Sequence, residues 1–173
     1  MPEKKTIERA RRAKREGKAP STQAGEFVRE TMEHIREGKH GARSTKQAIA
    51  IGLSKARRAG VKVPPPKKGT TSEKTRQSAA RAARAGQSGH PHKTNPRRSA
   101  AITHALQREG HEAASPEALS RQAKQQARKR TAGERSEIAE KAARTRLAHQ
   151  THAERSAIAR KAARTRTARQ GAS

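Results

Sequence analysis

The chain has 173 residues and carries 42 Lys or Arg against 15 acidic residues, which gives a formal net charge of +27. It contains no cysteine, so disulfides, thiol catalysis and Cys-bound zinc are excluded. Leu, Ile, Val and Phe number only 15 of the 173 residues, well under the roughly 20% below which a highly charged chain is expected to be disordered. We therefore expect no large shared core.

The charge predicts an acidic polymer or surface as partner, and nucleic acid is the commonest such polymer. No apolar run approaches the ~20 residues of a membrane span, and the N-terminus lacks the apolar core of a signal peptide. All the acidic residues are Glu, so Asp-based catalytic and metal sites cannot form. We expect a cytoplasmic protein of the nucleoid that is not an enzyme. We expect it to use no cofactor and to bind neither a small-molecule substrate nor a membrane.

Residues 1–20 carry eight Lys or Arg against three Glu, and only Ile7 could anchor a helix there. We expect a frayed basic arm. Residues 21–38 then predict a helix that Ser21 or Thr22 caps and Gly38 ends. Its apolar face would hold Ala24, Phe27, Val28, Thr31 and Ile35, with Met32 at the rim.

The densest apolar run lies in residues 44–66, and residues 44–68 contain no acidic residue. Two interpretations compete for it. Ile49, Ile51 and Leu53 alternate with small residues, which is a strand period. The capping-box pattern of Ser44 to Gln47 and the stop at Gly60 before the prolines favour a helix instead, and we prefer the helix.

As a helix, this segment places a ridge of small residues (Ala48, Gly52, Ala56) where the Phe27 helix could approach closely. Val61 and Val63 could fold back over the pair before residues 64–66 turn to polyproline conformation. Ile51 would then be exposed within a basic face. The resulting αα-hairpin, residues 21–63, is marginal alone, so self-association through it is a possible partner interaction.

The residues of this segment also resemble those of a known protein family. Lys46-Gln47-Ala48-Ile49-Ala50-Ile51-Gly52-Leu53-Ser54, followed by Lys55-Ala56-Arg57 and preceded by a short helix that ends near Gly38, resembles a family of small basic bacterial proteins classed as a domain of unknown function. The resemblance covers about residues 21–66. It implies a bacterial origin and a recurrent helical unit, but no activity and no site residue.

Residues 64–95 predict a linker rich in Pro, Gly, Ser and Lys, with a short helix near residues 77–85. Residues 96–130 predict short basic helices, since Asn95-Pro96 and Ser115-Pro116 are both typical helix starts.

Residues 131–173 hold a repeat of 20 residues: Thr131 to Arg146 recurs as Thr151 to Arg166, and both copies open with a Thr-x-x-Glu capping box. One Ile per copy is too little for a stacked solenoid, so we expect a string of basic helices. In composition the C-terminal half of the chain is similar to the tails of linker histones and bacterial histone-like proteins.

The sequence thus predicts an all-α protein: a small αα-hairpin plus isolated basic helices, largely extended or disordered, without a large core. We expect sequence-independent, electrostatically driven binding of duplex DNA, as in histone-like nucleoid proteins, with helices that order on the DNA. The expected phosphate contacts are Lys46, Lys55, Arg57, Arg58, Lys62, Lys141, Arg144, Arg146, Lys161, Arg164 and Arg166.

Other functions are open at this point. A highly hydrophilic stress-protection protein without a defined complex has a similar composition. A helix-turn-helix regulator is less favoured, although Gln47 could read adenine. RNA or single-strand binding would need stacking aromatics, and Phe27 is the only Phe, Tyr or Trp. We expect no metal site, because neither His90/His92 nor His149/His152 has two further ligands.

Overall fold

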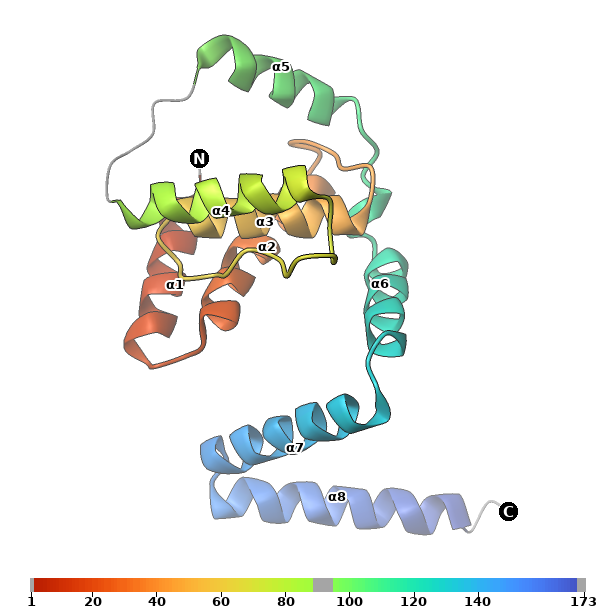
Figure 1. Ribbon diagram of the computed structural model, residues 1–173. Coiled ribbons are helices and arrows are strands. Elements are labelled where there is room, and N and C mark those ends of the chain that lie inside the picture. The colour runs from red at the N-terminus through yellow and green to blue at the C-terminus, as the bar shows by residue number, and fades with distance from the viewer. Residues whose placement is uncertain (1, 89–94, 171–173) are drawn as a thin grey trace. The chain divides into compact units, whose positions relative to one another are not determined.

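The structure is a computed structural model that describes residues 2–88 and 95–170, and every regular element in these two ranges is helical (Figure 1). The chain divides into two compact units, Met1–Ala123 and Lys124–Ser173. The all-α prediction is confirmed. The expectation of a largely extended or disordered chain is wrong, because helices cover most of the described residues and those of the first unit pack against one another.

The first unit is built on a hairpin of α2 (Pro20–Arg36) and α3 (Thr45–Arg58). Gly38 adopts a positive φ of 73° just after the end of α2, where the sequence placed a left-handed cap. The Ser44 hydroxyl accepts a hydrogen bond from the Gln47 amide, so the helical interpretation of this segment is confirmed over the strand. The start of α2 differs from the prediction: Ala19 is the N-cap and Pro20 lies in the first turn, so neither Ser21 nor Thr22 caps the helix.

The small residues of α3 bring its backbone onto α2, as predicted. Ala48 and Ala56 have no exposed area. A Cβ built on Gly52 would lie 2.6 Å from the Cα of Val28, which is closer than real Cβ contacts. Only glycine therefore permits this helix spacing.

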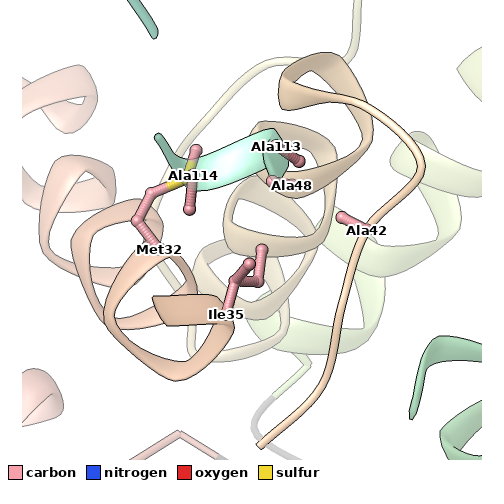
Figure 2. Close-up of a cluster of buried hydrophobic side chains, with 6 residues drawn as sticks. All are labelled: Met32, Ile35, Ala42, Ala48, Ala113 and Ala114. Carbon is pink, nitrogen blue, oxygen red and sulfur yellow. The ribbon is translucent and has the colours of Figure 1, made fainter. Parts of the chain in front are cut away.

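The buried side chains form two small clusters in the first unit. One gathers around Phe27, which is 1% exposed, and includes Ala10, Ala24, Ala56 and Val61, with Ile7, Leu53 and Val63 partly buried against it. Val61 and Val63 thus fold back over the hairpin as predicted. The second cluster, drawn in Figure 2, joins Met32 and Ile35 of α2 to Ala42, Ala48, Ala113 and Ala114.

A segment far along the chain completes the second cluster. The short 3₁₀ helix η1 (Glu112–Ala114) lies against α2 and α3. The Arg36 guanidinium Nε donates to the Ala114 carbonyl oxygen at 2.9 Å, and the Thr45 hydroxyl donates to that of Ala113 at 2.8 Å. Residues 96–130 are therefore not simply separate helices, since their middle part is built into the hairpin unit.

The N-terminal residues are not a frayed arm. They form α1 (Lys4–Arg15), which packs on α2 through buried Thr6, Ala10 and Ala13. Across this contact, Arg9 Nε lies 3.0 Å from Glu26 Oε2, and the Glu3 amide donates to Glu30 Oε2 at 3.2 Å.

The segment expected as a linker holds α4 (Glu73–Gln87), which is longer than predicted and packs on α3. Ala79, Ala82 and Ala83 form its buried face. A Cβ on Gly86 would collide with the carbonyl oxygen of Arg57, so this glycine seats the end of α4 on the end of α3. The linker prediction missed this contact because alanine supplies all of the buried face.

Two further helices follow, with the starts that the sequence predicted. The Asn95 side chain caps α5 (Pro96–Gln107), which has no buried residue. The Ser115 hydroxyl accepts from the Ala118 amide at the start of α6 (Pro116–Arg128), and Leu119 of α6 packs partly against the Met32 cluster.

The second unit holds the end of α6 with α7 (Ala132–His149) and α8 (His152–Gln170). Both predicted capping boxes are present: Glu134 Oε2 accepts from the Thr131 amide at 2.8 Å, and Glu154 Oε2 accepts from that of Thr151 at 2.7 Å. Among the described side chains of α7 and α8, none is buried. Ile138 and Ile158 are 47% and 53% exposed, which agrees with a string of helices and not a solenoid.

Candidate nucleic-acid interface

Lys55 is not part of an exposed basic face. Its Nζ lies 3.1 Å from Oε1 of Glu30, a side chain that is 1% exposed, and the Lys55 side chain is 18% exposed itself. Burial alone would raise the pKa of the Glu30 carboxyl, but the nearby Thr6 hydroxyl and the Lys55 ammonium outweigh burial and hold that pKa below its ordinary value. Glu30 and Lys55 thus form an internal ion pair between α2 and α3.

Arg57 is also withdrawn from the surface. It is 6% exposed, and its guanidinium donates to the carbonyl oxygens of Val63 and Pro64 at 3.2 Å and 2.9 Å. Burial lowers its pKa, since a guanidinium away from water is less stable in its charged form. Arg57 holds the segment after α3 in place, which positions Val61 and Val63 over the core.

Three of the five expected hairpin contacts are exposed: Lys46 in the first turn of α3, Arg58 at its last residue, and Lys62 just beyond it. Ile51 differs from the prediction, because it is half-buried and not exposed. The hairpin surface therefore offers fewer cations than the sequence suggested. Whether these three contact phosphate stays a prediction, as does self-association through the hairpin.

The outward face of α1 is a basic surface that the sequence analysis missed. Thr6, Ala10 and Ala13 turn inward and leave the cations of the helix other than Arg9 in solvent. Its signal was the spacing of those three small residues, at i, i+4 and i+7, opposite a run of cations. The exposed cations of α1 are Lys4, Lys5, Arg11, Arg12, Lys14 and Arg15.

Most of the glutamates are engaged within the protein. Glu26 pairs with Arg9 and Arg29, at 3.0 Å and 2.8 Å. The Glu3 carboxylate accepts from His34 Nε2 at 2.9 Å, and this hydrogen bond lowers the Glu3 pKa. Further carboxylates pair with cations nearby: Glu16 with Arg12 and Lys18, Glu37 with Lys39, Glu73 with Arg76, and Glu109 with Arg43.

The expected contacts of the second unit lie in solvent. Lys141, Arg144 and Arg146 of α7 are exposed, as are Lys161, Arg164 and Arg166 of α8. In α7, Arg144 Nη2 lies 3.5 Å from Glu140 Oε2, and both side chains are largely exposed. Such a pair is weak, but it competes with a phosphate for the same guanidinium.

Other kinds of site find no support in the described parts of the chain. No group of three His, Cys, Asp or Glu there could hold a metal ion. His90 and His92 lie outside the described residues. None of the helices in residues 2–88 and 95–170 has the length and apolar character that a bilayer span requires.

Residues 3–68 match the model of a family of unknown function, DUF6496. No curated protein and no solved structure matches the chain. The family match begins at α1. It therefore includes a helix that precedes residues 21–66, the range over which the sequence itself showed a resemblance. Its range ends before α4. The comparisons therefore show that the part of the chain from α1 through the prolines after α3 is similar to an uncharacterised domain family.

Proposed function

We propose that this protein binds duplex DNA without sequence preference, through phosphate contacts from exposed Lys and Arg side chains, as part of the bacterial nucleoid. The observation that carries the proposal is the separation of charge within the molecule. Carboxylates are engaged in ion pairs and helix caps, as Glu26, Glu30 and Glu154 are. The large excess of cations remains in solvent.

Phosphate contacts suit these side chains better than base contacts do. Gln47, the side chain that could read adenine in a helix-turn-helix, already accepts a hydrogen bond from the Arg43 amide at 2.9 Å. Phe27 is buried, so no Phe, Tyr or Trp side chain is left to stack on a base. Contacts of this kind position a protein on the backbone and carry no sequence information.

Each unit supplies exposed cations for the proposed phosphate contacts. In the first unit they are Lys46, Arg58 and Lys62 with the outward cations of α1. In the second unit they are the cations of α7 and α8. Because these cations are spread over several helices, many weak phosphate contacts would add up to steeply salt-dependent binding.

Fluorescence anisotropy with two labelled duplexes of unrelated sequence, measured over a series of salt concentrations, tests the proposal. We expect equal affinities for both duplexes and a linear fall of log K with log salt, with a slope of about −0.9 for each phosphate contact. Salt-insensitive or absent binding would count against DNA as the partner. A marked preference for one duplex would favour the helix-turn-helix alternative.

Circular dichroism separates DNA binding from the stress-protection alternative. The helices α7 and α8 have no buried side chain among those described and open locally at low cost, so a gain of helix signal at stoichiometric duplex supports DNA binding. A gain that appears only on drying or crowding, with no effect of DNA, supports a hydrophilic protein that coats macromolecules without a defined complex.

A further inference from the structure

The two copies of the C-terminal repeat share one scaffold. The capping boxes at Thr131 and Thr151 have the same hydrogen bonds. The hydroxyls of Thr145 and Thr165 donate to the carbonyl oxygens of Lys141 and Lys161, at 2.9 Å and 3.0 Å. The copies therefore differ in their side chains and not in their helical framework.

Between residues 131–146 and their equivalents 151–166, the formal charges of the two copies differ on one side of the helix only. At about 100° per residue, Arg135 and Arg146 of α7 lie on one side of the helix, and Lys141 and Arg144 lie on the opposite side. Arg155, Arg166, Lys161 and Arg164 occupy the equivalent places in α8.

The second side of α7 also carries carboxylates. Glu137 and Glu140 lie one turn before Lys141 and Arg144, the (i, i+4) order that favours ion pairing, and Glu140 is 3.5 Å from Arg144. In α8 the same positions hold Ala157 and Arg160. The second side of α8 thus gains a third cation and lacks both carboxylates.

From this difference, and on the basis of the proposed function, we infer that α8 is the main DNA-contacting copy of the repeat and that α7 contributes less. Its Arg160, Lys161 and Arg164 bind backbone phosphates, while the equivalent side of α7 is neutralised by its own glutamates. Like charges one turn apart, such as Arg160 and Arg164, destabilise a free helix, and a phosphate placed between them relieves that repulsion.

Duplex DNA fits α8 better than an anionic membrane does. A helix that lies in a membrane interface needs a continuous apolar face. The large apolar side chain of α8 is Ile158 alone, and cations stand on both of its sides. Arg and Lys on two sides can instead reach phosphates on both strands that border a groove.

A pair of matched double variants of the full chain tests the assignment. K161Q/R164Q and K141Q/R144Q remove the same charge from equivalent, exposed positions of the two helices. In the anisotropy series over salt, we expect K161Q/R164Q to make the log–log slope shallower by about 2, at about 0.9 per lost contact. The slope for K141Q/R144Q should change by less than about half as much.

A gain-of-charge variant supplies the converse. E137A/E140R gives α7 the pattern of α8, and we expect its slope to become steeper by about 1 to 3. Circular dichroism without DNA checks that all three variants remain helical.

The outcomes separate the two proposals. Equal slopes for K161Q/R164Q and K141Q/R144Q, with wild-type binding intact, would mean that only total charge matters. This result would overturn the assignment of α8 but not the proposed function. Absence of salt-dependent binding by the wild type would overturn the proposed function itself. Stronger retention of the wild type on vesicles of anionic lipid than on DNA, lost in K161Q/R164Q, would replace DNA by a membrane as the partner of α8.

Discussion

The two units of this protein use alanine in opposite ways. In the first unit Ala24, Ala48 and Ala56 are fully buried, whereas the described alanines of α7 and α8 are exposed. The first unit has what alanine needs in order to be buried: a large side chain such as Phe27 to fill the centre, and Gly52 to bring two helices together. Helix propensity alone therefore gives α7 and α8, while close packing gives a core.

Charge follows the same division. In the first unit Glu30 is buried and paired with Lys55, and Arg57 fastens the chain after α3. In the second unit Glu134 and Glu154 act in helix caps, and the cations are left in solvent. The first unit thus uses some of its charges for folding, whereas the expected contacts of the second unit all lie in solvent.

The largest expected effect comes from emptying the centre of the first unit. Phe27→Ala should lower the free energy of unfolding by about 3–5 kcal/mol, because it leaves a cavity among side chains that cannot close it. Ile158→Ala is the control in the second unit, where the side chain is 53% exposed, and it should change stability by less than about 0.5 kcal/mol. Urea unfolding followed by circular dichroism measures both, and similar midpoints for the two variants would contradict the difference between the units.

Loss of the internal carboxylate should have the next largest effect. Glu30→Gln leaves Lys55 and the Glu3 amide without their charged acceptor, and we expect a loss of about 2–4 kcal/mol. Glu140→Gln, at the exposed pair with Arg144, is the control and should cost no more than about 0.5 kcal/mol. Equal losses would show that the Glu30 pair is no more important than a surface pair.

Acid should act through the same group. The Glu30 pKa is lower in the folded protein than its ordinary value of 4.5, so its contribution to stability is complete above that value and is lost as the pH falls through the folded pKa. The stability of the wild type should therefore decline below about pH 4.5, whereas Glu30→Gln should lack this part of the decline. Urea midpoints at several pH values for both proteins measure it, and parallel curves would contradict the assignment.

Alanine substitutions at two glycines, one at the contact of α2 and α3 and one away from it, test how closely the two helices approach. Gly52→Ala places a Cβ 2.6 Å from the Val28 backbone, and we expect a loss of about 1–3 kcal/mol as the helices move apart. Gly25, in the middle of α2, has nothing within 4 Å of the added Cβ, so Gly25→Ala should stabilise by about 0.5–1 kcal/mol. Stabilisation by both substitutions would mean that the helices do not approach as closely as the structure shows.

The smallest effect should come from a helix cap in the second unit. Thr131→Ala removes the capping hydroxyl of α7 and should weaken that helix by about 0.5–1 kcal/mol. Amide exchange rates in the first turns of α7 should rise, while those of α3 stay unchanged. A change in α3 would show that the units are coupled in stability.

The sequence alone was enough for the hairpin, because its signals are local. Gly38, Ser44 and Gly52 each mark a cap or a close approach at a fixed spacing, and the apolar face of α2 follows the helical period. The Thr-x-x-Glu patterns at Thr131 and Thr151 likewise predicted the two C-terminal capping boxes. These features depend on residues within a few positions of one another, which a pattern can detect.

The parts that could not be predicted depend on distant small residues. Ala113 and Ala114 join the Met32 cluster although Ala114 lies 78 residues beyond Arg36 in the chain, and no pattern of alanines identifies such a partner. The pairing of Lys55 with Glu30 likewise depends on the helix register across the hairpin, whereas the run of cations by itself predicts an exposed face. The packing of α1 and α4 was missed for the same reason, since alanine forms most of their inner faces.

Amide hydrogen exchange of the full chain, with and without duplex DNA, tests the central contrast most directly. Without DNA, we expect strong protection in α2 and α3 and little in α7 and α8, because helices without buried side chains open locally at low cost. DNA should add protection in the second unit, most of all in α8, and change the cores of α2 and α3 little. Equal protection of both units without DNA, or no response of α8 to DNA, would contradict the account.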